Sequence, residues 1–130
     1  PEVRRSVINR FETIVHGIAD AMGCKAAITI RRMTPAVIND PAIANLAQRA
    51  ILKAMPEIKL VNDYKTMVSE DMAFMMEKVP GCYMMVGSGF SDPDRAFGHH
   101  HPQFDIDESA LPFAAAAVTA AVLEVLEELK

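Results

Sequence analysis

One short segment constrains the fold of this chain more than any other. Residues 82–86 are Cys-Tyr-Met-Met-Val, an uninterrupted apolar run that lies between Gly81 and Gly87. A strand with one wet face has alternating polarity, so an uninterrupted run predicts a strand that is buried on both faces. Such strands are typical of α/β proteins. The polar residues 87–98 that follow are expected to form a loop at the carboxyl end of this strand, where α/β proteins collect their ligands.

The first forty residues have the pattern of a helix followed by a strand. Apolar residues recur every three or four positions over residues 3–22, which predicts an amphipathic helix, and Gly23 suits a left-handed C-cap. His16 within this helix is expected at the surface. Residues 27–31 (Ala-Ile-Thr-Ile-Arg) have the composition of a strand. A helix followed directly by a strand is half of a small α+β layer.

A second helix has clear signals at both ends. Asp40 is a typical N-cap, Pro41 suits the first helical position, and Pro56 ends the apolar pattern. Residues 39–40 could therefore act as a hinge between two domains or as an ordinary loop. Residues 58–61 read as a short strand.

Two further helices are predicted towards the C-terminus. Ser69 is expected to cap the first of them, with Glu70 and Asp71 in its first turn, where carboxylates favour the helix dipole. The second begins at Ala110 and is rich in alanine. The apolar side chains of the first helix are expected in the core: Met72, Phe74, Met75 and Met76.

Composition excludes several classes of function. The 130 residues carry 13 basic and 17 acidic side chains, a net charge of −4, so nucleic acid and anionic membranes are poor partners. The apolar run 110–123 is too short and too rich in alanine for a membrane span. Cys24 and Cys82 are expected to be buried, reduced thiols of a cytoplasmic protein, with one disulfide as the open alternative.

Three of the four histidines stand together at His99, His100 and His101, and three carboxylates follow within eight residues. Imidazole is the commonest protein ligand of borderline transition metals, so the cluster is a candidate metal site. A solvated polar loop without a ligand is the alternative, because a metal centre needs ligands from several segments. The cluster alone does not decide between them.

Three motifs, in order, resemble the C-terminal part of the metal-dependent amidohydrolases of the aminoacylase/carboxypeptidase group. This group includes hippurate hydrolases, N-acyl-amino-acid amidohydrolases and indole-acetyl-amino-acid hydrolases. The likeness covers essentially the whole chain, and its last motif is the most specific. The motifs are Thr34–Pro41, then Ser69–Phe74 with Lys78–Gly81, then His100–Glu108 with Ala110–Pro112.

The resemblance implies a fold and a domain division. Such enzymes have a zinc-exopeptidase-like α/β catalytic domain and an inserted ferredoxin-like lid domain that mediates dimerisation. Residues 1–38 would be the last helix and strand of the lid, and residues 39–130 the C-terminal part of the catalytic domain. A homodimer is therefore expected.

The resemblance also assigns candidate site residues. His100 aligns with the family's last metal ligand, whereas His99 is an extra residue and His101 falls where the family varies. Asp105 and Asp107 are candidates to orient the imidazole, although helix capping is the alternative for Asp107 and for Glu108. The family's substrate pocket is lined by the segment that matches Ser69, Glu70 and Asp71. Met67 and Val68 precede it where glycines are frequent, which weakens any role for backbone amides there.

By the same resemblance, the reaction is hydrolysis of the amide bond of an N-acyl amino acid by a two-metal centre. Zinc suits imidazole and carboxylate ligands best, and manganese, cobalt and nickel stay open. The general base and the other metal ligands are expected upstream of Pro1, so no catalytic residue is assigned within this chain, which alone should be inactive. The alternatives are a non-enzymatic dimerisation or regulatory module and, less well supported, a stand-alone metal carrier that uses His99–His101.

Overall fold

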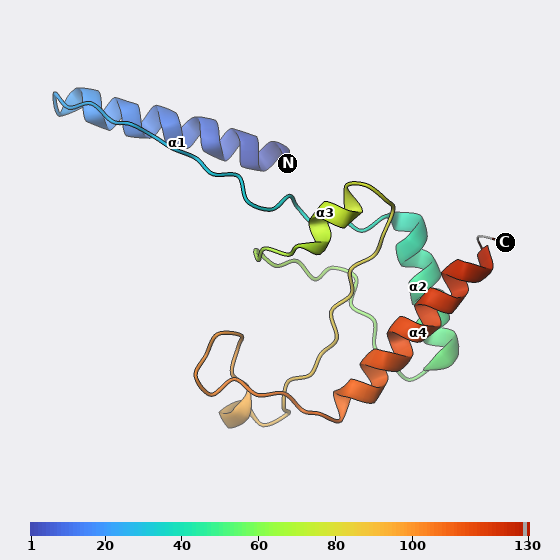
Figure 1. Ribbon diagram of the computed structural model, residues 1–130. Coiled ribbons are helices and arrows are strands. Elements are labelled where there is room, and N and C mark those ends of the chain that lie inside the picture. The colour runs from blue at the N-terminus through green and yellow to red at the C-terminus, as the bar shows by residue number, and fades with distance from the viewer. Residues whose placement is uncertain (129) are drawn as a thin grey trace.

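The computed structural model describes residues 1–128 and 130, and within these residues the chain forms α-helices, one short 3-10 helix and no strand. Helices α2 and α4 lie side by side, and α1 stands apart from them, with residues 24–38 running back along it (Figure 1). The elements in chain order are α1 (Glu2–Ala21), α2 (Pro41–Ala54), α3 (Met72–Met76), η1 (Pro93–Arg95) and α4 (Ala110–Glu128).

Helix α1 ends as the sequence predicts. Gly23 has a φ of 68°, and its N–H donates to the carbonyl of Asp20 at 3.0 Å. The N–H of Cys24 donates to the carbonyl of Ala19 at 2.8 Å, which completes a Schellman motif. The helix buries none of its residues, and the apolar side chain of Phe11 is 51% exposed.

Helix α2 begins and ends where its signals place it. The Asp40 carboxylate accepts hydrogen bonds from the backbone N–H groups of Ala42 at 2.9 Å and Ile43 at 3.1 Å. Pro41 occupies the first turn, and the helix ends at Ala54, two residues before Pro56. The predicted N-cap is therefore confirmed.

The core is small and consists mainly of alanine. Within the described residues, its buried side chains come from α2, α3 and α4, and α2 packs against α4. Small side chains let two helix backbones approach closely, at the cost of burying little apolar area per residue. The buried residues are Ala47, Ala50, Ile51, Ala73, Ala117 and Ala121.

The three predicted strands are not formed within the described residues. Residues 27–31, 58–61 and 82–86 run as open chain without a ladder of hydrogen bonds. A strand is stable only when neighbouring strands satisfy its backbone N–H and C=O groups, and no such neighbour lies beside these segments. The α/β prediction is thus not reproduced at the level of strands, and the loop at 87–98 contains only η1.

The start of α3 differs from the prediction. Ser69 does not cap the helix; instead the Glu70 carboxylate accepts a hydrogen bond from the N–H of Met72 at 3.3 Å. Because α3 has only five residues, it offers the core a single fully buried side chain, Ala73. Placing the following side chains in the core was wrong for Phe74 and Met75, which are about half exposed at 47% and 55%.

Helix α4 is longer than the apolar run that predicted it. Over its most apolar window its mean hydropathy is 1.7, so by length and composition it could cross a membrane, which corrects the judgement that the run is too short. Only 11% of that window is buried. The same helix packs one face on α2 through Ala117 and Ala121, as a helix of a globular domain does.

Candidate functional site

The histidine cluster lies on a tight turn before α4. The N–H of His101 donates to the carbonyl of Gly98 at 3.2 Å, and this bond closes the turn around His99 and His100. His100 has a φ of 69° and is the single non-glycine residue with positive φ in residues 1–128 and 130. Histidine tolerates this region better than most residues, but the conformation is still strained.

The three neighbouring histidines have different surroundings. The ring of His101 stacks on Phe97 with centroids 4.4 Å apart, and its Nδ1 accepts a hydrogen bond from the N–H of Gln103 at 3.1 Å. The ring of His99 meets Phe104 edge-on at 4.9 Å. In the part of the chain that the structure describes, the exposed ring of His100 has neither a ring contact nor a hydrogen bond. The turn thus presents His100 between two anchored histidines.

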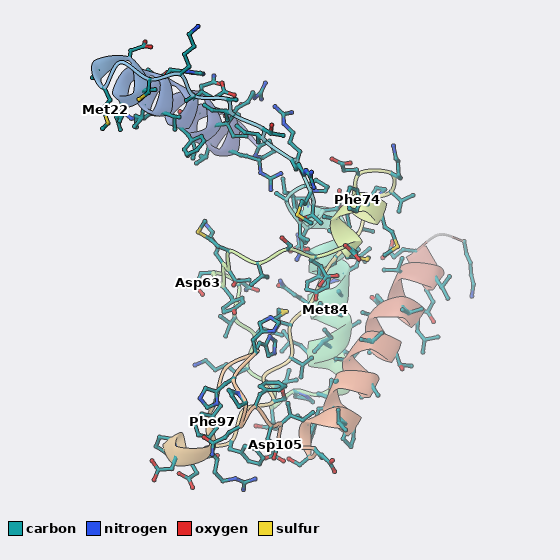
Figure 2. All side chains as sticks on the ribbon, turned by 60° about the vertical axis from the view of Figure 1, so that its left-hand side comes forward. Met22, Asp63, Phe74, Met84, Phe97 and Asp105 are labelled. Carbon is teal, nitrogen blue, oxygen red and sulfur yellow. The ribbon has the colours of Figure 1, made fainter. Side chains whose placement is uncertain are left out.

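The carboxylates near this turn serve the backbone rather than the histidines. Asp105 Oδ1 accepts from the N–H of Ile106 at 2.8 Å, and Oδ2 lies 3.8 Å from Arg95. Asp107 Oδ1 accepts from the N–H of Ser109 at 3.0 Å in the turn just before α4, which agrees with the capping alternative. Hydrogen bonds from Ser109 lower the pKa of Asp107. Among the described residues, neither Asp105 nor Asp107 bonds to His100, so the predicted orientation of His100 is not seen. Figure 2 shows Asp105 and Phe97 at the same end of the molecule.

The described residues fit one metal ligand rather than a complete centre. No three His, Cys, Asp or Glu side chains among them come close enough to hold an ion together. His100 offers an exposed imidazole, and a neutral imidazole is a suitable donor for zinc. The chemistry of His100 therefore fits one ligand of a metal ion.

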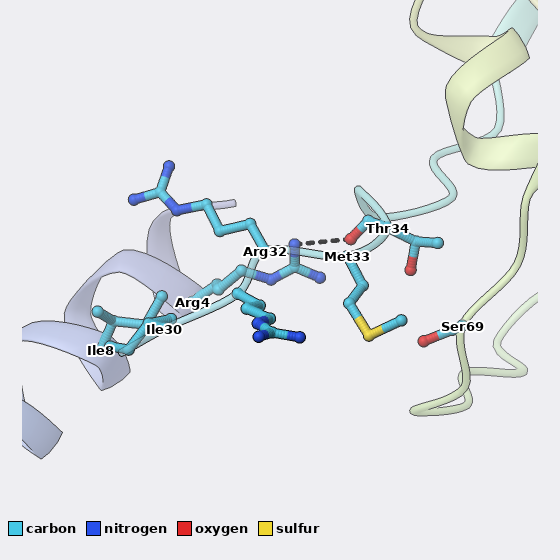
Figure 3. Close-up of a pocket in the computed structure, with 8 residues that line it drawn as sticks. Arg4, Ile8, Ile30, Arg32, Met33, Thr34 and Ser69 are labelled. Carbon is cyan, nitrogen blue, oxygen red and sulfur yellow. Dashed lines mark hydrogen bonds between the residues drawn. The ribbon is translucent and has the colours of Figure 1, made fainter. Parts of the chain in front are cut away.

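Ser69, predicted to contact substrate, lines the same pocket as three arginines. A shallow pocket of about 180 Å³ is lined by Ser69 and by residues of α1 and of the segment after it. Arg4 Nη1 donates to the carbonyl of Thr34 at 2.8 Å across this pocket (Figure 3). Within the described residues, neither Arg31 nor Arg32, which also line the pocket, pairs with a carboxylate. The pocket suits an anionic group.

Glu70, the second predicted substrate residue, is occupied by protein contacts. Its Oε2 accepts a hydrogen bond from the Tyr83 hydroxyl at 2.8 Å. This bond, followed by the one from Met72, lowers the pKa of Glu70, and the same bond raises the pKa of Tyr83. It therefore stabilises the fold between about pH 4 and pH 10, the ordinary pKa values. The contribution is lost as pH falls through the lowered pKa or rises through the raised one. The third residue, Asp71, is exposed.

Two of the resemblance motifs meet in space. The start of α2 and the turn after α3 line a pocket of about 370 Å³. The N–H of Asp40 donates to the carbonyl of Gly81 at 2.9 Å across this contact. The sequence did not predict that Asn39 forms hydrogen bonds with Tyr83. It also did not predict that arginines line the pocket of Ser69. The Tyr83 phenol was a signal only for its bond to Glu70, because a hydroxyl in a run expected to be buried needs a partner. Asn39 bonds the backbone of Tyr83 instead, and no local sequence pattern points to that bond.

The cysteines are both free thiols, and one prediction about them was wrong. Cys24 is exposed rather than buried, because it lies on the chain just beyond α1. Cys82 is half-buried, and this burial raises the pKa of its thiol. A raised pKa keeps a thiol protonated and unreactive, which argues against a nucleophilic role for Cys82.

Comparisons with known proteins give a consistent result. Residues 6–124 match peptidase family M20/M25/M40. The N-acetyl-L-cysteine deacetylase of Bacillus subtilis (strain 168) is 33% identical over 110 residues, which cover 85% of this chain and 25% of that protein. The N-acetyldiaminopimelate deacetylase of Anoxybacillus flavithermus (strain DSM 21510 / WK1) is 32% identical over 119 residues, 92% of this chain and 30% of that protein.

A second N-acetyldiaminopimelate deacetylase, from Streptococcus thermophilus (strain CNRZ 1066), is 29% identical over 119 residues, 90% of this chain and 30% of its own length. The chain therefore spans 25–32% of the length of the curated relatives it matches. No solved structure matches it. The family match extends over nearly the whole chain and includes all three motifs that suggested an amidohydrolase. The chain therefore belongs to peptidase family M20/M25/M40.

Proposed function

We propose that this chain forms the C-terminal part of a metal-dependent amidohydrolase that cleaves the amide bond of N-acyl amino acids, including hippurate-like substrates. The observation that carries the proposal is the turn at residues 98–101, which presents one imidazole, that of His100, between two histidines anchored on phenylalanines. The names of the relatives support the substrate class, since those proteins remove acetyl groups from amino acids.

His100 is the proposed ligand of a divalent metal, zinc in the first instance. When bound, a two-metal centre would activate water and polarise the scissile carbonyl. The imidazole of His100 would contribute a nitrogen donor to this centre. The general base and the remaining ligands are proposed to lie outside these 130 residues, so the chain alone is expected to be inactive.

Ser69 and the arginines beside it are proposed to bind the free carboxylate of the substrate. An N-acyl amino acid carries a free α-carboxylate, and guanidinium groups recognise carboxylates through paired hydrogen bonds. The pocket that contains Ser69 also has an apolar lining from Ile8, Ile30 and Met33. This combination suits a ligand with one anionic and one apolar end.

The domain division is also part of the proposal. Residues 1–38 would end the lid domain and residues 39–130 would belong to the catalytic domain of a cytoplasmic homodimer. Helix α1 carries an apolar stripe of exposed side chains that includes Phe11, Ile14 and Ile18, and this stripe supports an intermolecular role for the lid. The same stripe favours the alternative, in which the chain acts as a dimerisation module without catalytic activity.

The intact mass of the native gene product is the first measurement. A product much heavier than 14.2 kDa is expected, and one of 14.2 kDa would rule out the enzyme for this molecule. The native protein is then assayed for metal-dependent release of amino acids from N-acyl substrates.

In that protein, His100→Ala should lower both bound metal and kcat/KM by about 100-fold or more, since even residues that only orient a metal ligand are worth 10- to 100-fold. The matched control, His99→Ala, should change either quantity little. Equal losses in the two variants would show that His100 is not the ligand.

A further inference from the structure

Three segments that are distant in the sequence meet at Tyr83. The side-chain oxygen of Asn39, 44 residues away, accepts a hydrogen bond from the Tyr83 N–H at 2.8 Å. The Asn39 amide nitrogen donates to the Tyr83 carbonyl at 3.0 Å. On its other side, the Tyr83 hydroxyl reaches Glu70, 13 residues away, at 2.8 Å. Both the backbone and the side chain of Tyr83 are therefore held.

The asparagine end of this chain of contacts is fixed to α2. Asn39 directly precedes Asp40, whose carboxylate caps the helix and whose N–H donates to the carbonyl of Gly81. The paired bonds of Asn39 replace those that a neighbouring strand would make with the peptide of Tyr83. The position of Tyr83 is thus set relative to the rigid start of α2.

The glutamate end lies in the middle of the candidate substrate segment, residues 69–71. Glu70 Oε1 accepts from the N–H of Met72, and Oε2 accepts from Tyr83. Because each carboxylate oxygen already has a protein donor, Glu70 is poorly placed to bind substrate itself. Its exposed neighbours, Ser69 and Asp71, remain accessible. Ser69 also lines the arginine pocket.

We propose that Tyr83 is a positioning residue of the amidohydrolase. Through its hydrogen bond to Glu70 it holds residues 69–71 in a fixed position relative to α2, so that Ser69 faces the substrate carboxylate. Glu70 is then a link in the support of the pocket rather than a substrate ligand. This inference rests on the proposed function, and it assigns to Tyr83 and Asn39 a role that the sequence motifs did not.

The test uses Tyr83→Phe in the native protein, because this change removes one hydroxyl and little volume. We expect KM for an N-acyl amino acid to rise about tenfold, because a hydrogen bond to a charged group is worth at least about this factor. The kcat of the variant should stay within about threefold of the wild-type value. Bound metal should stay unchanged, since none of the hydrogen bonds of Tyr83, Asn39 and Glu70 involves His100. The matched control is Tyr64→Phe, which alters an exposed tyrosine and should leave KM unchanged.

Two further readouts separate positioning from general stability. Glu70→Gln keeps an acceptor oxygen for the phenol and should retain most of the affinity, whereas Glu70→Ala should match Tyr83→Phe. Amide hydrogen exchange at residues 69–73 should accelerate in Tyr83→Phe and not in Tyr64→Phe. If Tyr83→Phe does not fold, Glu70→Gln and Glu70→Ala decide the question by the same KM comparison.

The outcomes distinguish the two proposals. An active wild-type protein with equal KM in wild type and Tyr83→Phe overturns the positioning role and leaves the proposed function intact. Equal KM in Glu70→Gln and Glu70→Ala would overturn it as well. A wild-type protein that releases no amino acid from N-acyl substrates overturns the proposed function, and the positioning role fails with it.

Discussion

A single backbone angle distinguishes His100 from its two neighbours. The φ of 69° places its Cβ close to the following carbonyl, which costs a residue with a side chain about 1 kcal/mol or more. Glycine would relieve this cost, yet the position holds an imidazole whose ring makes no contact in the described structure. Strain of this kind is kept where the surroundings impose it, and it is concentrated at functional sites.

This strain leads to a prediction about stability at the histidine turn. His100→Gly should unfold with a free energy about 0.5–1 kcal/mol higher than that of His100→Ala, because glycine adopts positive φ without a steric penalty. At His99, where φ is not positive, the order should reverse, with the alanine variant more stable. Urea denaturation of the four variants in metal-free buffer measures both differences. If the glycine and alanine variants had the same order of stability at both positions, the backbone of His100 would not be strained.

Helix boundaries were the most predictable elements, because their determinants are local. The Asp40 carboxylate reaches N–H groups two and three residues ahead, and Gly23 ends α1 with its own φ. Caps of this kind are visible in any short window of sequence. The start of α3 was misplaced because Glu70 competes with Ser69 for the same orphan N–H groups, and it is drawn to Tyr83 as well.

Strands and the wider site were less predictable, because their determinants are distant. The run at 82–86 has the composition of a buried strand, but a strand depends on neighbours that composition does not specify. The partnership of Asn39 with Tyr83 spans 44 residues and follows no periodic pattern. The prediction of His100 rested on family motifs, whereas its distinction from His99 and His101 by ring packing emerged only in three dimensions.

The alanine contact between α2 and α4 leads to a prediction about stability. Ala121 is 6% exposed at this contact, so Ala121→Leu adds three carbons where no space exists and should lower the free energy of unfolding by about 1–3 kcal/mol. The control is Ala116→Leu on the exposed side of the same helix, which should change it little. Thermal or urea unfolding of the native protein measures both. Equal effects would mean that the helices do not pack through Ala121.

At the scale of the whole molecule, α1 carries a stripe of exposed apolar side chains. Along α1, Phe11, Ile14 and Ile18 are each at least half exposed. Soluble proteins seldom leave such a stripe uncovered, and a second subunit is the occupant in the proposed homodimer. The stripe is therefore the natural place to test assembly.

The test of assembly is Phe11→Glu in the native protein. Placing a charge in the apolar stripe should convert the homodimer to monomers, since burying an unpaired carboxylate is strongly unfavourable. Asn9→Glu introduces the same charge on the opposite side of α1 and should leave the dimer intact. Light scattering after size-exclusion chromatography gives both masses. A dimer that survives Phe11→Glu would place the interface elsewhere.

The pairing of α2 with α4 also has a consequence for synthesis in the cell. The two helices are separated by residues 55–109, so α2 emerges from the ribosome well before its partner exists. At about 5–20 residues per second, this interval lasts roughly 3–11 seconds. During that time the face of α2 that carries Ala47 and Ile51 is uncovered, and a chaperone that recognises short apolar segments has its best opportunity to bind.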